Sequence, residues 1–109
     1  MDECVFCKII SGDIPAKIIY EDDICLVFPD IRPIANTHFL IIPKKHISTI
    51  AEIEDGDEKI LGHMLKKAKE IALEKNITGY QLLFRVGKEG GQEIFHIHLH
   101  LTSNQKAED

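Results

Sequence analysis

Three histidines alternate with three aliphatic residues near the end of the chain, in the stretch His96-Ile97-His98-Leu99-His100-Leu101-Thr102. Successive side chains of a β-strand point to opposite faces, so the pattern predicts a strand with imidazoles about 6.5–7 Å apart on one face. Such a row suits a metal site, nucleophilic catalysis or a proton-sensitive switch. A surface strand whose polar face happens to be histidine is the structural alternative, and three histidines in register disfavour it.

A second group of possible metal ligands or redox residues lies at the other end of the chain. Cys4 and Cys7 are three residues apart and would lie on the same side of a helical turn. A single C-x-x-C pair indicates a zinc half-site, a redox pair or chance, and the βαβ pattern that normally accompanies a redox pair is absent. Cys25 lies in the apolar run 24–28 and is interpreted as a small core residue.

Two further features have an ordinary structural interpretation from the residues alone. The glycine-rich stretch 87–92 could let backbone N–H groups approach a phosphate, but the residues alone favour an ordinary hairpin loop. His63 stands beside apolar neighbours in a helical pattern and is interpreted as a histidine at the helix surface or the edge of the core.

The periodicity of the chain predicts the elements that must position these residues. Apolar residues from Ile60 to Ala72 follow helical spacing with charges on the other face, which indicates one long amphipathic helix. A short helix is expected over 4–10, ending at the turn signal Ser11-Gly12-Asp13. Strands are expected at 17–20, 24–28, 38–42, 80–86 and in the histidine stretch. The sum is an α+β domain with a mainly antiparallel sheet of about five strands, one long helix and one short helix.

Composition limits the class of protein. A chain of 109 residues with 44% hydrophobic residues is expected to form one domain over 1–109. The net charge of 13 − 18 = −5 argues against a nucleic-acid phosphate-backbone binder. We see no membrane span and no signal-peptide pattern, which predicts a cytoplasmic protein with reduced cysteines unless they bind metal. The polar segment 103–109 is expected to be a flexible tail.

Several stretches together resemble the histidine triad (HIT) superfamily, and in particular its Hint branch. The three alternating histidines follow a Gly90-Gly91-Gln92 loop, and the resemblance extends over nearly the whole chain from Cys4 to about Leu101. The other stretches that carry it are 6–10, 14–19, 21–23, 37–48 and 61–63.

The resemblance implies an α+β domain that forms a homodimer with one continuous sheet across both subunits. It also implies hydrolysis or transfer at the α-phosphorus of nucleotides. The Hint branch cleaves purine nucleoside phosphoramidates, such as AMP joined to an amine, through a nucleotidyl-histidine intermediate. A purine nucleoside monophosphate or its phosphoramidate is therefore the expected ligand.

Residue roles follow from the same resemblance. His98 matches the nucleophile, His100 a histidine that contacts and orients the phosphate, and His38 a fourth active-site histidine. Asp30 matches the ribose-binding acid, and Gln92 lies at the loop on the phosphate side. The apolar slot for the base corresponds to Phe6, Ile9, Phe28 and Ile31, with Val5 at its border.

Some bacterial members of the superfamily bind structural zinc, and the corresponding residues here are Cys4, Cys7, His46 and His96. Two thiolates and two imidazoles suit tetrahedral zinc. Other members fold without these cysteines, so the expected zinc is structural and no catalytic metal is required.

Three features depart from the Hint pattern. Arg85 replaces the usual Asn, Glu93 replaces the usual Ser or Thr, and the chain after Leu101 lacks the usual Gly-Gly-Arg segment. Arg85 and Glu93 could pair across the hairpin, or the carboxylate could point inward and repel a phosphate. Two alternatives to an enzyme therefore stay open, which are a non-catalytic purine-nucleotide-binding or scaffold protein and a zinc-storage protein that uses several histidines.

Overall fold

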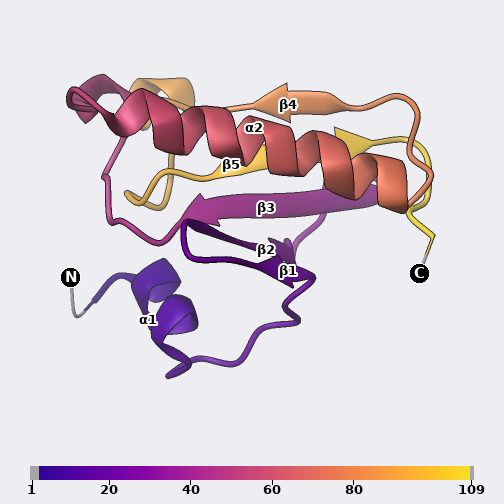
Figure 1. Cartoon of the computed structure of the whole chain (residues 1–109), viewed down its shortest axis with the longest axis horizontal. Helices are drawn as coiled ribbons and strands as arrows, with labels where there is room; N and C mark the ends of the chain where they lie inside the picture. Colours follow the sequence, from indigo (N-terminus) through magenta and orange to yellow (C-terminus); the bar gives the residue numbers. More distant parts are fainter. Residues whose placement is uncertain (1–2, 109) are drawn as a thin grey trace.

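Five strands and two helices make up the fold in a computed structural model that describes residues 3–108 (Figure 1). The helices are α1 (Val5–Ser11) and α2 (Asp57–Glu74). The strands are β1 (Tyr20–Glu21), β2 (Cys25–Pro29), β3 (Thr37–Pro43), β4 (Gln81–Leu83) and β5 (Leu99–Ser103). Single 3₁₀ turns at Ile50–Glu52 and Lys88–Gly90 complete the chain. No helix within the described residues is long and apolar enough to cross a membrane.

All neighbouring strands of the sheet are antiparallel, in the order β1-β2-β3-β5-β4. Leu40 of β3 lies opposite both Phe28 of β2 and His100 of β5, and His100 lies opposite Leu83 of β4. One row of side chains therefore crosses the sheet from an aromatic residue to an imidazole. The predicted α+β class and antiparallel five-stranded sheet are confirmed.

The three central strands are covered on both faces. One face, which includes Val27, Ile41 and Leu99, packs against Met64 and other residues of α2 in the larger core cluster. The opposite face packs against Phe6 and its neighbours on α1 in a smaller cluster that includes Leu26, Phe28, Leu40 and Ile42. Because side chains alternate along a strand, His100 stands on the α1 face while its neighbours Leu99 and Leu101 belong to the α2 core.

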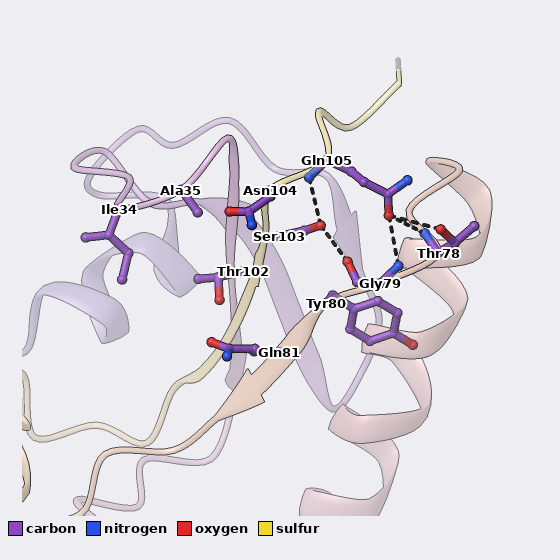
Figure 2. A pocket seen from close by; sticks show the side chains of 10 residues that line it. All are labelled: Ile34, Ala35, Thr78, Gly79, Tyr80, Gln81, Thr102, Ser103, Asn104 and Gln105. Carbon is purple, nitrogen blue, oxygen red and sulfur yellow. Dashed lines mark hydrogen bonds between the residues drawn. The ribbon is translucent and has the colours of Figure 1, made fainter.

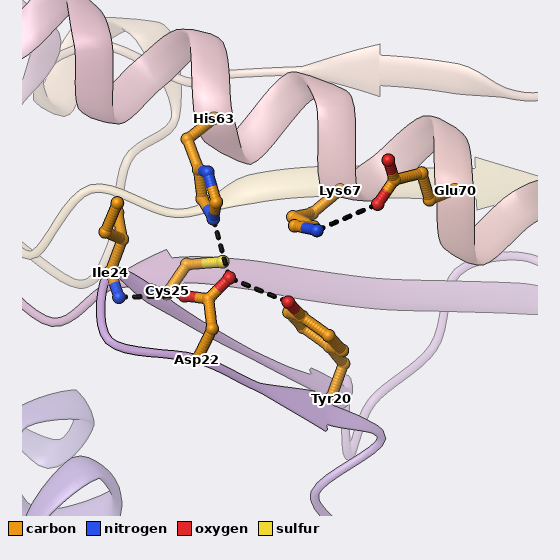
Figure 3. Close-up of polar contacts among 7 residues, drawn as sticks. All are labelled: Tyr20, Asp22, Ile24, Cys25, His63, Lys67 and Glu70. Atoms are coloured by element: carbon orange, nitrogen blue, oxygen red, sulfur yellow. Dashed lines mark hydrogen bonds and ion pairs between the residues drawn. The ribbon is translucent and has the colours of Figure 1, made fainter.

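A polar network fastens α2 to the hairpin between β1 and β2 (Figure 3). The Asp22 carboxylate contacts His63 Nε2 of α2 at 2.6 Å and accepts a hydrogen bond from the Tyr20 hydroxyl at 2.8 Å. Although burial acts in the opposite direction, hydrogen bonds led by the Cys25 amide hold the pKa of the Asp22 carboxyl well below its usual range. His63 therefore ties the helix to the hairpin, at the edge of the core.

The histidine stretch is not one continuous strand, and this part of the prediction was wrong. The strand begins at Leu99, so His96 and His98 precede it. The Ile97 N–H donates to the Ile47 carbonyl at 2.8 Å, in the loop after β3. The backbone at this point therefore bonds to a loop rather than to a neighbouring strand. The strand expected over 80–86 is also shorter, at Gln81–Leu83.

The segment expected to be a flexible tail over 103–109 is tied down as far as residue 108, and that expectation needs correction. Ser103 is the last residue of β5. The side-chain oxygen of Gln105 accepts hydrogen bonds from the amides of Thr78 and Gly79. The Ala107 amide donates to the Thr37 hydroxyl at 2.8 Å. Asp109 lies outside the described residues.

Candidate active site

A cavity of about 570 Å³ opens on the α1 side of the sheet and collects most of the predicted nucleotide-binding residues. Its walls come from α1, the end of β2, the loop 30–34, the first half of β3, the segment 85–94 and the start of β5 with the residue before it. The predicted residues that line it are Phe6, Ile9, Phe28, Asp30, Ile31, His38, His98 and His100. Val5, Arg32, Ile34, Leu40, Arg85, Gly91, Glu93 and Ile94 line it as well.

His98 is held in one orientation by its own backbone. Its Nδ1 lies 2.8 Å from the His96 carbonyl oxygen, which can only accept, so Nδ1 carries the proton and Nε2 keeps its lone pair. The ring packs edge-on against Phe6 with centroids 5.1 Å apart. Burial lowers the pKa of His98, with a further contribution from the positive charge of Arg85. The imidazole is therefore neutral and available as a nucleophile near pH 7.

His38 and His100 form a direct contact between imidazoles. His38 Nε2 and His100 Nδ1 are 2.9 Å apart, and the two rings are almost completely buried. Burial lowers the pKa of His38, and it lowers the pKa of His100 to about 4, with help from His98 and Arg85. Both rings are therefore uncharged at neutral pH.

Asp30 stands at the end of β2, next to this pair. One carboxylate oxygen accepts the Arg32 amide at 2.8 Å and so shapes the turn, and the other lies 3.5 Å from His38 Nε2. Phe28 precedes it on the same edge and contacts Phe6 edge-on at 5.7 Å. Ile31 stands at the rim with 92% of its surface exposed, where a ligand would cover it.

The structure places Gln92 differently from the prediction. Its side-chain nitrogen donates to the carbonyls of Ser48 and Ile94, and its side-chain oxygen accepts from the Gly87 amide. The side chain is buried and does not line the cavity. Gln92 therefore fixes the shape of the glycine-rich loop instead of pointing at a ligand.

Arg85 lines the cavity, although sequence reasoning suggested only that it pairs with Glu93 and gave it no role in ligand binding. Its guanidinium Nη1 lies 3.2 Å from His100 Nε2. Within residues 3–108 it makes no ion pair with Glu93, so the suggested pairing across the hairpin is not formed. The sequence carried a signal for this contact. Alternate residues of an extended segment point to one face, so positions 81, 83 and 85 share the face of the sheet that carries His100.

Cys4, Cys7, His46 and His96 converge on one point beside the cavity. Cys4 caps α1 by accepting the Cys7 amide on its sulfur, which brings both thiols together. His46 Nδ1 lies 3.3 Å from Cys7 Sγ and 3.1 Å from His96 Nδ1, and His96 Nδ1 lies 3.4 Å from Cys4 Sγ. The four atoms all lie within 4.8 Å of one another.

These distances fit a tetrahedral ion. Zn–N bonds of about 2.05 Å and Zn–S bonds of about 2.3 Å place ligand atoms about 3.3–3.8 Å apart. The Nε2 of His96 lies 2.8 Å from the Pro43 carbonyl and must carry its proton there. Its Nδ1 lone pair is therefore directed at the thiols, as a metal ligand requires.

Asp22, Cys25 and His63 form another cluster of possible ligands (Figure 3). The Asp22 carboxylate already accepts four hydrogen bonds, two of them from the amides of Ile24 and Cys25. Burial raises the pKa of the Cys25 thiol to about 12. The cluster is therefore saturated and suits a structural tie better than a metal, and Cys25 is the core residue that was predicted.

A slightly larger cavity, of about 610 Å³, lies at the other end of β5 (Figure 2). Its lining includes Tyr80, Gln81, Thr102 and Asn104 but contains no carboxylate, imidazole, amine or thiol. Ser103 and Gln105 form hydrogen bonds to Gly79 and Thr78 that close its floor. The smaller cavity, with its histidines, is therefore the candidate active site.

Comparison with known proteins identifies the family. The family model described as "Scavenger mRNA decapping enzyme C-term binding" matches residues 3–109. The protein HitA of Neisseria gonorrhoeae is 44% identical over 102 residues, which are 93% of this chain and 95% of HitA. A HIT family hydrolase structure from Legionella pneumophila is 49% identical, with a TM-score of 0.91 and 95% of each chain covered.

The chain belongs to the histidine triad family. The HIT fold is one of nucleotide-binding hydrolases, which agrees with an imidazole-lined cavity. A zinc-bound histidine triad protein from Mycobacterium smegmatis is 34% identical, with a TM-score of 0.84, 99% of this chain and 84% of that chain covered. The convergence of four zinc-type ligands in this chain is therefore compatible with a metal site in the HIT fold.

The buried histidines of this HIT domain predict a loss of stability in acid. The folded-state pKa of His100 is about 4, below the usual 6.5, so between these values the unfolded chain binds more protons than the folded one. The contribution of neutral His100 to the unfolding free energy is therefore fully present above about pH 6.5, and it is lost as the pH decreases toward 4. His100→Gln should reduce the difference in unfolding free energy between pH 7.5 and pH 5 by about 1–2 kcal/mol.

Urea denaturation at the two pH values measures this effect. His38 and His98 titrate in the same direction and Asp30 and Arg85 face the pair, so part of the acid sensitivity should survive in the variant. An equal pH dependence in the wild type and His100→Gln would show that His100 is not held neutral by the fold.

Proposed function

We propose that the protein hydrolyses purine nucleoside phosphoramidates of the AMP–amine type at the α-phosphorus, with His98 as the nucleophile. The observation that carries the proposal is the bond between His98 Nδ1 and the His96 carbonyl, which leaves the Nε2 lone pair free in a cavity of nucleotide size. The resemblance to the Hint branch supplies the substrate class, and the similarity to HIT family hydrolases supports hydrolysis.

The chemistry takes two steps. In the first, His98 Nε2 forms a bond to phosphorus while the P–N bond to the amine breaks, and the departing amine takes a proton from solvent, because the three cavity imidazoles are uncharged. The bond from His98 Nδ1–H to the His96 carbonyl stabilises the positive charge that develops on the ring. In the second, water attacks phosphorus and releases a proton to solvent, the P–Nε2 bond breaks, His98 returns to the neutral form and AMP is released.

The remaining cavity residues bind the nucleoside in this proposal. The purine lies in the apolar slot between α1 and the end of β2, formed by Phe6, Ile9, Phe28 and Ile31. The free lone pairs of the Asp30 carboxylate accept hydrogen bonds from the ribose hydroxyls. His38 positions the His100 ring through the hydrogen bond between them, and the His100 ring lies beside the phosphate.

Substitution of the nucleophile tests the mechanism. His98→Ala should lower kcat for an adenosine phosphoramidate with a fluorogenic amine by at least about a thousandfold, because no other group can form the covalent intermediate. The variant should still fold and bind AMP. His63→Gln, a histidine of α2 outside the cavity, serves as the control and should keep wild-type turnover. Undiminished turnover in a folded His98→Ala protein would refute the mechanism.

One observation favours a second candidate function, which is nucleotide binding without turnover. Glu93 lines the same cavity as the histidines, where its carboxylate would repel a bound phosphate. A folded wild type that binds AMP but shows no turnover of the phosphoramidate would favour this function.

We also propose that Cys4, Cys7, His46 and His96 hold one structural zinc ion. The ligand distances and the bond from His96 Nε2 to the Pro43 carbonyl support this assignment. Zinc would join α1, the loop after β3 and the histidine segment, and would take no part in the chemistry. A cytoplasmic location, in which the thiols stay reduced, belongs to the same proposal, and the three cysteines are free.

Removal of a ligand tests the zinc site. Cys4→Ala should lose the single zinc ion measured by elemental analysis and, at zinc concentrations a hundred times the Kd, about 2.7 kcal/mol of unfolding free energy. Cys25→Ala removes a thiol outside the cluster and should keep the zinc. Zinc that is retained in Cys4→Ala, or lost in His98→Ala, would contradict the assignment and favour a storage role.

We further propose a homodimer in which the sheet continues from β4 of one subunit to the other. The strand β4 lies at the edge of the sheet, and its residues Leu82 and Leu83 are 38% and 44% exposed. An exposed apolar edge strand offers unpaired backbone groups to a second copy.

A charge on this edge tests the dimer. Leu82→Lys should shift the mass measured by light scattering from dimer to monomer, because a buried lysine at the joined edge is costly. Ile18→Lys, an exposed isoleucine beside the opposite edge strand β1, should leave the mass unchanged. A wild-type mass of one chain would exclude the dimer at that concentration.

A further inference from the structure

The His38–His100 pair is flanked at both ends by groups that can only donate hydrogen bonds. At one end the Ile34 backbone N–H lies 3.3 Å from His38 Nδ1, and at the other Arg85 Nη1 lies 3.2 Å from His100 Nε2. Between them, His38 Nε2 and His100 Nδ1 are 2.9 Å apart. A neutral imidazole has one N–H donor and one acceptor nitrogen, so the two rings can serve only one of the two flanking donors.

Two arrangements of the protons are possible. If His38 Nε2 donates to His100 Nδ1, the Ile34 amide finds an acceptor and His100 Nε2 carries a proton toward Arg85. If the proton lies on His100 Nδ1 instead, Arg85 finds an acceptor and His38 Nδ1–H faces the Ile34 N–H.

The first arrangement is the more stable one. The Ile34 amide belongs to the backbone and cannot turn away, whereas the guanidinium of Arg85 stands on a flexible side chain. The Asp30 carboxylate, 3.5 Å from His38 Nε2, attracts a proton on that nitrogen and would repel a lone pair there. His100 therefore presents an Nε2–H donor to the cavity.

The result is a pair of donors with no acceptor between them. His100 Nε2–H and the Arg85 guanidinium, 3.2 Å apart, both line the cavity. Arg85 makes no ion pair within the described part of the chain. A side chain at Gly91 would place its Cβ 3.2 Å from Arg85 Cδ, so the glycine leaves room for the arginine stem. Two such donors suit one anionic oxygen.

The order of the groups shows which part of a substrate reaches this donor pair. Asp30, His38, His100 and Arg85 contact one another in that sequence. With the ribose at Asp30 and phosphorus at the histidines, Arg85 lies beyond His100, on the side away from the ribose site. The amine departs opposite His98 Nε2, and a charged substituent on it can extend to the donor pair. Besides Asp30, the only carboxylate among the described residues that lines the cavity is that of Glu93. Glu93 is exposed, so solvent screens its charge more than it screens the charge of the partly buried Arg85.

We propose that Arg85, together with the Nε2–H of His100, binds a negatively charged group on the leaving amine and so selects anionic leaving groups such as the carboxylate of an amino acid. This inference rests on the proposed nucleotidyl transfer and adds the specificity of the same site. The attraction acts on the leaving group's charge and leaves the bonds made and broken at phosphorus unchanged.

A matched pair of substrates tests the proposal. Adenosine 5′-phosphoramidates of glycine and of glycinamide differ by a carboxylate and a neutral amide of the same size. In Arg85→Gln, the ratio of kcat/KM for glycine over glycinamide should fall at least about tenfold relative to the wild type, and intrinsic reactivity cancels in this comparison. Arg85→Lys should keep part of the preference. Lys88→Gln, which removes a charge from the same loop outside the cavity lining, should not change the ratio.

Binding to a His98→Ala protein separates this proposal from the proposed catalysis. The ratio of Kd values for the same two compounds, measured with and without Arg85→Gln, requires no turnover. A ratio that depends on Arg85 supports the proposal even if the wild type is inactive. An unchanged ratio in both assays, or failure of the glycine compound to bind, overturns it. If the ratio is unchanged, turnover of both compounds would leave the proposed function intact.

Discussion

His96 is the point at which three segments of the chain meet, and the geometry of the cavity depends on it. Its ring is fully buried, with Nε2 at the carbonyl that ends β3 and Nδ1 at the two thiols of α1. Its backbone carbonyl binds the ring of His98. One residue therefore joins the short helix, the central strand and the nucleophile. A displacement of His96 would disturb helix packing and nucleophile orientation together.

The chemistry of the cavity depends on which nitrogens carry protons, and the surrounding backbone decides this. A carbonyl fixes the proton of His98 on Nδ1, so its Nε2 faces the ligand as a lone pair. In the proton arrangement proposed above, the Ile34 amide donates to His38 Nδ1, the His38 Nε2–H donates to His100 Nδ1, and His100 carries its proton on Nε2. Neighbouring imidazoles thus serve opposite purposes, one as nucleophile and one as donor, although burial keeps both neutral.

Much of this arrangement could be predicted from the sequence, because period and spacing are local properties. The long helix follows from the helical spacing of its apolar residues, the strands and the core position of Cys25 follow from short apolar stretches, and the resemblance located the four zinc-type ligands. The strand start at Leu99 could not be predicted, because it depends on a backbone bond from Ile97 to a distant loop. The inward placement of Gln92 and the contact of Arg85 with His100 likewise depend on partners far along the chain.

The alternation of side chains along β2, β3 and β5 separates two tasks. Leu99 and Leu101 belong to the core under α2, whereas His98 and His100 belong to the cavity on the other face. No residue of α2 lines that cavity. The outer surface of the helix is therefore free to change during evolution or protein engineering, for instance in charge or as an attachment surface, while the reacting groups keep their positions.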